Sequence, residues 1–202
     1  MRVIKIKLVI WESLRKMFGS VTRYLVRAYN SMYRKFCNHV DRLSYKAFHD
    51  ELTGVYNRAG YEHLLSALDF ESTYILLVDV DNFKGVNDTF GHDAGDKILT
   101  KIVKLLKINF RSDDCICRIG GDEFVVFMVQ SAPGMKELLI RKISKINESL
   151  SDTSDGLPAV SISAGVVFGS CIANDENIIQ KADDALYRIK RNGKNGIAFF
   201  EA

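Results

Sequence analysis

The chain has 202 residues, of which 47% are hydrophobic and 26% charged. This is the composition of a soluble globular protein, and it excludes a disordered or fibrous chain. The net charge of +3 is unevenly spread, because residues 1–48 hold 11 Lys and Arg against 2 Asp and Glu, hence +9, whereas the rest carries −6. Either this segment attracts anionic lipid, nucleic acid or an acidic partner, or it is a solvated basic helix.

The four cysteines show no paired Cys-x-x-Cys spacing and no accompanying His cluster; they are Cys37, Cys115, Cys117 and Cys171. We therefore expect reduced thiols, with neither a zinc site nor a disulfide framework. The sequence contains no run of about 18 apolar residues, so no membrane span is predicted. The apolar start at 3–11 is not followed by a cleavage-site pattern, so no signal peptide is predicted. The expected location is cytoplasmic, at most peripheral at the inner membrane.

A long helix is predicted over residues 8–47. Its apolar residues recur first in alternating steps of three and four and then in two steps of four: Trp11, Leu14, Phe18, Val21, Leu25, Ala28 and Met32, then Phe36, Val40, Leu43 and Ala47. This pattern is typical of a coiled coil with a stutter. We favour a self-associating helix, because a heptad seam needs a partner to bury it; the alternative is one amphipathic helix packed on its own domain.

From residue 48 to 202 the pattern is that of a separate α/β or α+β domain. Helices are predicted at about 58–68, 93–110, 134–150 and 174–191. Strands are predicted at 74–80, 115–119, 123–129, 159–168 and 197–200, with a hairpin around the glycines at 120–121. The order is αβααββαβαβ-like, which predicts a central, mostly antiparallel sheet flanked by helices and preceded by the N-terminal helix.

The first candidate site is Val78-Asp79-Val80-Asp81, where a buried strand ends in two carboxylates. A carboxylate in that place costs desolvation unless a positive group pairs with it, and a divalent cation would do so. The alternative is a solvated strand end.

The second candidate is Gly120-Gly121-Asp122-Glu123, at the tip of an apolar hairpin. Two glycines let the backbone approach a ligand, and two acids follow at once. The alternative is an ordinary turn, since Gly and Asp both favour turns. Two acidic strand ends in one domain indicate a shared Mg²⁺ site of the kind used in phosphoryl transfer.

Two further segments are polar or basic. Residues 87–96, just before a predicted helix, are either a loop with Asp93 or Asp96 as the helix N-cap or a nucleobase site, because one carboxylate can accept both guanine N–H groups. Lys190-Arg-Asn-Gly-Lys194 closes a helix with basic residues. Favourable charges at a helix C-terminus explain that run, and phosphate contact is the functional alternative.

Together these residues resemble the GGDEF family of diguanylate cyclases over about residues 48–202. Five motifs recur in the family's order and spacing: Asp50-x-Leu-Thr-Gly-x-x-Asn-Arg58, Asp79-x-Asp-x-Phe-Lys84, Asn87-Asp-x-x-Gly-His-x-x-Gly-Asp96, Arg118-x-Gly-Gly-Asp-Glu-Phe124 and Asp184-x-Leu-Tyr-x-x-Lys190. Each motif alone is weak, whereas a chance match of all five in register is very improbable.

The resemblance implies a palm-type, polymerase-like fold and the condensation of two GTP molecules into cyclic di-GMP with release of two pyrophosphates. Each family domain holds one GTP, and two domains meet face to face as a homodimer. Each 3′-hydroxyl then attacks the α-phosphate of the other nucleotide. Such catalysis rests on positioning and charge neutralisation, so no Ser–His or Cys–His nucleophile is needed, and none is found.

The resemblance also implies residue roles. Two Mg²⁺ or Mn²⁺ ions per site would be held by Asp79, the Val80 carbonyl, Asp122 and Glu123. The last two are the expected catalytic pair, with Asp122 helping to deprotonate the 3′-hydroxyl. Asn87 and Asp96 match the guanine-reading pair, and His92 lies in the same substrate loop. The positions that match phosphate contacts are Phe83, Lys84, Gly120, Gly121, Lys190 and Lys194.

Arg111-Ser-Asp-Asp114, just before the hairpin, resembles the family's product-inhibition site for cyclic di-GMP. Its Arg could grip phosphate or guanine, and its Asp could accept guanine N–H groups. The alternative is a helix-to-strand loop with an exposed ion pair.

Three departures from the family pattern leave the site intact. Asp122 stands where Glu is also frequent, and Asn82 replaces a frequent aromatic or hydrophobic residue. Lys194 stands where Arg is common, and it keeps the charge but loses the planar fork.

The expected function is thus an active cyclase whose N-terminal helix controls domain pairing. The alternative from a different class is a non-catalytic cyclic di-GMP receptor, against which the intact acids argue. A cyclase with another product is a third reading, although Asp96 favours guanine. No nucleic-acid partner is expected, and docking of the basic segment on a membrane or a protein is a separate alternative.

Overall fold

The computed structural model of the protein describes residues 16, 18–19, 24–25, 27, 29–36, 39, 42, 44–169 and 178–200. The chain divides into two compact units, Met1–Lys46 and Ala47–Ala202. The described residues between 16 and 48 are helical. Several predictions fall outside the described residues: the apolar positions at 11, 14, 21, 28, 40 and 43, two of the cysteines (Cys37 and Cys171), and the start of the last helix at 174–177.

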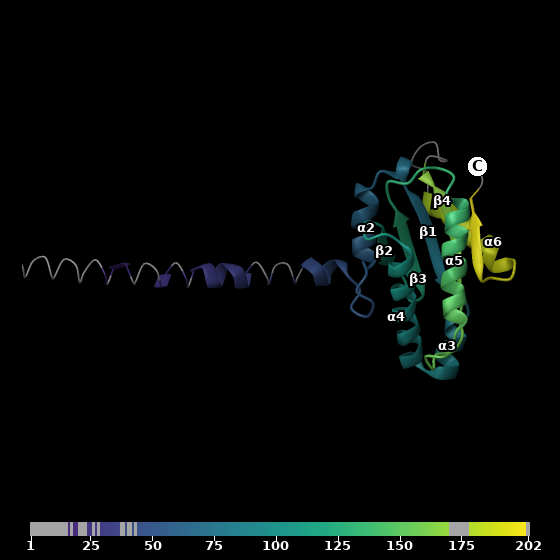
Figure 1. Cartoon of the computed structure of the whole chain (residues 1–202), viewed down its shortest axis with the longest axis horizontal. Helices are drawn as coiled ribbons and strands as arrows, with labels where there is room; N and C mark the ends of the chain where they lie inside the picture. The colour runs from purple at the N-terminus through teal and green to yellow at the C-terminus, as the bar shows by residue number, and fades with distance from the viewer. Residues whose placement is uncertain are drawn as a thin grey trace, which may run out of the picture. The chain divides into compact units, whose positions relative to one another are not determined.

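A five-stranded sheet forms the centre of the second unit, in the order β2-β3-β1-β4-β5 (Figure 1). The strands are β1 (Tyr74–Val80), β2 (Cys115–Arg118), β3 (Glu123–Met128), β4 (Ile162–Phe168) and β5 (Gly196–Phe199). All neighbours pair antiparallel except β4 and β5, which are parallel. The predicted, mostly antiparallel sheet is therefore confirmed.

Helices cover both faces of this sheet (Figure 1). They are α2 (Arg58–Ala67), the short η1 (Phe70–Ser72), α3 (Phe83–Phe90), α4 (His92–Asn109), α5 (Lys136–Ser151) and α6 (Ile178–Arg191). Side chains alternate along β1, so Leu76 and Val78 pack in the cluster under α4 and α5. Ile75 and Leu77 pack in the cluster under α2 and α6. Because both faces are buried, β1 is apolar throughout except for Asp79 near its end.

The alternative of a loop over residues 87–96, before the helix predicted at 93–110, is wrong in part. Residues 83–90 form α3, and Gly91, at φ 83°, is the N-cap of α4. Asp93 and Asp96 therefore lie inside α4, and neither caps it. The sequence did not predict α3, because most of its residues are polar or exposed and Val86 is its only buried residue.

No helix in the described part of the chain is long and apolar enough to cross a membrane. Of the two described cysteines, both are free thiols. Burial raises the pKa of the Cys117 thiol to about 12, so it stays protonated near neutral pH.

Candidate active site

The strand register brings the two acidic motifs together. In the antiparallel pairing of β1 with β3, Asp79 lies directly opposite Glu123. One residue further, the Val80 N–H donates to the Asp122 carbonyl at 3.2 Å. Residues opposite each other in such a pair have side chains a few ångströms apart. Acids that are far apart in the sequence therefore meet at one end of the sheet.

The negative charge of the Asp79 carboxylate is only partly neutralised by its neighbours. It is buried, and Lys190 of α6 forms an ion pair with it at 2.7 Å. Burial nevertheless raises the pKa of Asp79; Lys190 opposes that rise, and the charges of Asp122 and Asp81 add to it. A site with this charge balance and only hard oxygen donors fits a divalent cation. Among the described residues, no three Asp, Glu, His or Cys side chains lie close enough together to hold a metal ion.

The other strand-end acid, Asp81, has a different environment. Its carboxylate accepts hydrogen bonds from Ser161 Oγ at 2.6 Å, Ser163 Oγ at 2.8 Å and the Asn195 N–H at 3.0 Å. These donors stabilise its charge without a metal. The sequence indicated both Asp79 and Asp81 as possible cation ligands. Asp81 has these hydroxyl and backbone donors, whereas Asp79 lacks them.

The signature hairpin turn is tight. The N–H groups of Ile119 and Gly120 donate to the Glu123 carbonyl at 3.0 and 3.5 Å. A Cβ on Gly120 would lie 2.5 Å from the Glu123 carboxylate. With any larger residue at position 120, the Glu123 carboxylate would have to move away from the turn. Glu123 is exposed and Asp122 half-exposed, so both are accessible to a ligand.

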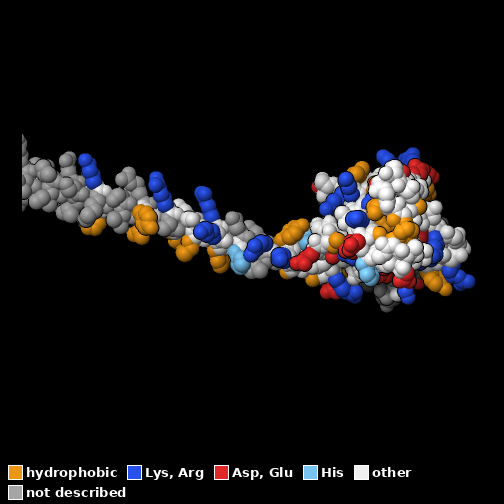
Figure 2. All heavy atoms as spheres, turned by 90° about the horizontal axis from the view of Figure 1, so that it is seen from below, with side chains coloured by type: hydrophobic (Ala, Val, Ile, Leu, Met, Phe, Trp, Pro, Cys, Tyr) orange, Lys and Arg blue, Asp and Glu red, His pale blue; other side chains and the backbone are white. Residues whose placement is uncertain are grey.

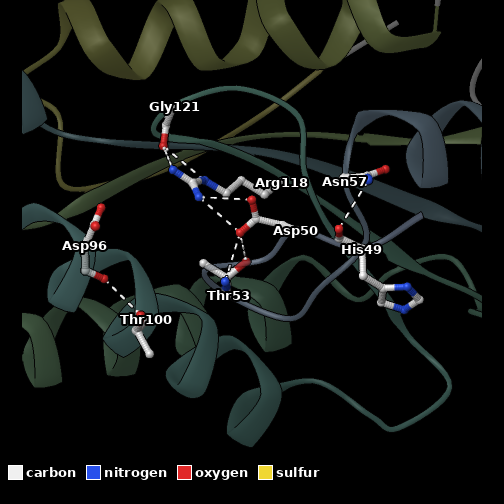
Figure 3. A network of polar contacts seen from close by, with 8 residues as sticks. All are labelled: His49, Asp50, Thr53, Asn57, Asp96, Thr100, Arg118 and Gly121. Atoms are coloured by element: carbon white, nitrogen blue, oxygen red, sulfur yellow. Dashed lines mark hydrogen bonds and ion pairs between the residues drawn. The ribbon is translucent and has the colours of Figure 1, made fainter. Parts of the chain in front are cut away.

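Arg118 ties this turn to the start of the domain (Figure 3). Its Nε and Nη2 donate to the Gly121 carbonyl at 3.2 and 2.8 Å, and its Nη1 donates to both oxygens of Asp50 at 3.1 and 3.2 Å. Asp50 also accepts from the Thr53 N–H at 2.9 Å and from the Thr53 hydroxyl. Both residues stood in predicted motifs, but no role for either followed from the sequence.

A glycine fixes how the substrate-motif residues pack where α3 meets α4. A Cβ on Gly95 would lie only 2.0 Å from Asn87 Oδ1 and 3.1 Å from the Phe83 ring. The Asn87 side chain can therefore occupy its observed position only beside a glycine. Asn87 Oδ1 is buried and has no hydrogen-bond partner within the described residues. An orphaned buried acceptor of this kind is typical of a ligand subsite.

The remaining predicted substrate residues are exposed: Lys84 on α3, His92 and Asp96 on α4, and Lys194 in the turn after α6. Lys190 is half-buried and already contacts Asp79. The structure thus pairs Lys190 with Asp79 and brings Asp122 and Glu123 to the same end of the sheet. It brings Asn87, Phe83 and Gly95 together as a second group.

The predicted inhibitory residues form a compact turn. Asp114 is buried, and its Oδ2 accepts from the Arg111 N–H at 2.8 Å. The alternative of an exposed ion pair is therefore wrong for Asp114. Its Oδ1 is buried without a partner among the described residues. Buried Asp114 and exposed Arg111 help to line a hollow of about 390 Å³. His49 and Tyr56 also line it, with their rings tilted by 31° and their centroids 4.7 Å apart.

Comparison with known proteins agrees with this geometry. The family described as "Diguanylate cyclase, GGDEF domain" matches residues 47–196. The diguanylate cyclase DgcM of Escherichia coli K12 is 31% identical over 170 residues, which cover 78% of this chain and 39% of that protein. The GGDEF domain of TpbB (YfiN) from Pseudomonas aeruginosa is similar with a TM-score of 0.66 and 31% identity, covering 76% of this chain and 94% of that one.

A third similar structure is the GGDEF domain of DgcB from Caulobacter crescentus in complex with c-di-GMP. It has a TM-score of 0.62 and 25% identity, covering 77% of this chain and 94% of that one. The chain therefore belongs to the GGDEF family, and the predicted family and fold class are confirmed. It spans less than half the length of the curated relatives, 39% of DgcM and 45% of the probable diguanylate cyclase DgcC.

Proposed function

We propose that this chain is a diguanylate cyclase, which condenses two GTP molecules into cyclic di-GMP and releases two pyrophosphates. The observation that carries the proposal is the β1–β3 register, which sets Asp79 opposite Glu123 with Asp122 beside Val80. Membership in the GGDEF family supports it. The incompletely neutralised negative charge of Asp79 is expected at a site that binds a triphosphate together with a cation.

Diguanylate cyclases of this family generally depend on a divalent metal. Two Mg²⁺ or Mn²⁺ ions would be held by Asp79, the Val80 carbonyl, Asp122 and Glu123. When bound, they would supply positive charge to the phosphates during displacement. Lys190 forms an ion pair with Asp79, and its long side chain would also be able to reach the phosphates.

The chain's own residues would bind and orient GTP. Asn87, with its unpaired buried oxygen, and Asp96 would accept the guanine N–H groups, with His92 beside them. Asp122 would take the proton of the attacking 3′-hydroxyl, and the oxygen of that hydroxyl then displaces pyrophosphate from the other nucleotide. The phosphates would lie against the groups at the signature turn, α3 and α6: Phe83, Lys84, Gly120, Gly121, Lys190 and Lys194.

Because each domain binds one GTP, the reaction needs a homodimer in which two sites face each other. The helical unit before residue 47 is the proposed dimerisation element. Its exposed Phe18, Leu25, Tyr29, Met32 and Phe36 recur at helical spacing. Figure 2 shows Lys and Arg on the opposite side of this helix, so pairing through the apolar side would leave the basic side free for a membrane or an acidic protein.

Product inhibition is proposed at Arg111 and Asp114. The unpaired Asp114 oxygen would accept from guanine N–H groups, and the exposed Arg111 would bind phosphate. The DgcB domain was solved with c-di-GMP, which supports this class of ligand. The same hollow also favours a second candidate function, a non-catalytic receptor for cyclic di-GMP.

Incubation of the purified chain with GTP and Mg²⁺, with products identified by mass, separates the two functions. A cyclase makes cyclic di-GMP, and Asp122→Ala abolishes it. Asp113→Ala is the matched control, because this exposed acid lies outside the catalytic site, although within the proposed inhibitory turn, and it should keep the initial rate. Absence of product from dimeric protein free of bound cyclic di-GMP would favour the receptor.

A further inference from the structure

Asp81 connects three separate parts of the sheet. It follows β1 directly and is 7% exposed. Two of its partners, Ser161 and Ser163, belong to the segment at the start of β4. The third is the Asn195 N–H, in the turn between α6 and β5. The carboxylate thus anchors that turn to the end of the strand that carries Asp79.

The anchored turn has an unfavourable backbone conformation. Lys194 and Asn195 both have positive φ, at 63° and 50°, and follow Gly193 at φ 105°. Asn tolerates the left-handed region, whereas Lys adopts it rarely. A turn with two such residues persists only where surrounding contacts hold it. The Lys194 N–H donates to the Ile189 carbonyl at 3.0 Å, and the next N–H, that of Asn195, donates to Asp81.

We propose that Asp81 is a positioning residue, which holds this turn so that Lys194 faces the phosphates of GTP. The proposal rests on the proposed cyclase function and adds a residue to it. Lys194 is exposed and no ion pair in the described residues holds its ammonium group, so the backbone of the turn sets the region that its flexible side chain can reach. Without Asp81 the turn can relax toward ordinary φ values, and the ammonium group moves away.

The same contacts argue against Asp81 as a cation ligand. Three donors already occupy both of its oxygens. An ionised carboxylate has about four lone-pair sites, so a cation there would compete with these donors for Asp81, and a buried hydroxyl that it displaced would lose its partner. Positioning and metal binding therefore predict different results for the same substitution.

The test compares Asp81→Asn, Lys194→Ala and the double variant by steady-state kinetics. We expect Asp81→Asn to raise the KM for GTP about tenfold with little change in kcat, as for a lost contact to a charged group. The Mg²⁺ concentration for half-maximal activity should stay unchanged. If Asp81 acts through Lys194, the double variant should be no worse than Lys194→Ala alone.

Asp69→Asn is the matched control, because Asp69 likewise accepts a backbone N–H and a hydroxyl, but before the other end of β1. It should leave the KM unchanged. The proposal would be overturned if the KM increases of the two single variants multiplied in the double variant. It would also be overturned if Asp81→Asn raised the Mg²⁺ concentration needed for half-maximal activity.

One measurement needs neither a variant nor activity. The Asn195 amide lies in an exposed turn, so its bond to Asp81 is what should slow its hydrogen exchange. Slow exchange in the wild-type chain supports the anchor, and exchange as fast as in a free peptide refutes it. A chain that makes no cyclic di-GMP but protects this amide would contradict the cyclase function alone.

Discussion

Replacing Arg118 by Ala should both destabilise the domain and misplace the signature turn. The side chain makes four hydrogen bonds, two to Asp50 and two to the Gly121 carbonyl, and the Arg118 and Asp50 side chains are 15% and 22% exposed. Hydrogen bonds to charged groups in partly buried places contribute about 2 kcal/mol net. For a domain of this size that corresponds to a fall in Tm of about 6 °C.

The loss of activity should exceed the loss of stability. Arg118 holds the Gly121 carbonyl, directly before the two signature acids, and a small displacement of reacting groups costs on the order of 100-fold in rate. Arg118→Lys should be intermediate, because one ammonium cannot reach Asp50 and Gly121 as a planar guanidinium does. Cyclic di-GMP formation should be measured well below the Tm of every variant, beside thermal unfolding by circular dichroism.

The effect on Tm should also depend on pH. Burial raises the pKa of Asp50, but hydrogen bonds from Thr53 and Arg118 outweigh it, so the pKa is lowered from 3.8. A lowered carboxyl pKa stabilises the fold above the unfolded value, and this is lost as the pH falls through the folded value. The difference between wild type and Arg118→Ala should therefore be full at neutral pH and shrink below about pH 4.

Arg58→Gln is the control for Arg118. Its ion pair with Glu62 is 74% and 63% exposed, so it should contribute little. An Arg118→Ala variant with wild-type activity and a Tm changed no more than that of Arg58→Gln would refute the positioning argument.

Three further predictions follow from the site. Gly95→Ala should raise the KM for GTP without lowering the affinity for cyclic di-GMP measured by calorimetry, because the new methyl group would force the Asn87 amide to move. Asp79→Asn should abolish product formation yet raise the Tm of metal-free protein at neutral pH, since burial raises the pKa of Asp79 and its charged form weakens the fold; an unchanged or lower Tm would contradict this. Arg111→Ala should leave the initial rate unchanged but raise the plateau of accumulated cyclic di-GMP, and a plateau equal to that of wild type would remove Arg111 from the inhibitory site.

Strands were easier to predict from the sequence than the first substrate helix. The run 74–80 is apolar on both faces and ends in acids, so its bounds were evident, and the observed β1 is Tyr74–Val80. By contrast, α3 buries only Val86. Its remaining residues include Gly, Asn, Asp and Thr, whose local preferences favour turns, and packing against α4 decides its conformation.

The site residues could be proposed from motifs, but their separate roles depended on distant contacts. Asp79 and Asp81 look equivalent in the sequence, and they differ because Ser161, Ser163 and Asn195 reach only the second acid. Nothing local indicates that Asp50 and Arg118, 68 residues apart, form one hydrogen-bonded unit. Such pairings depend on strand register and turn geometry, which sequence periodicity does not specify.

The central claim is that strand ends distant in the sequence make one cation and nucleotide site. Binding of Mn²⁺, followed by electron paramagnetic resonance in the presence of a non-hydrolysable GTP analogue, tests it most directly. Asp79→Asn and Glu123→Gln should each weaken Mn²⁺ binding, and the double variant should be little worse than either one. Mn²⁺ binding that is unaffected by both substitutions would contradict the account.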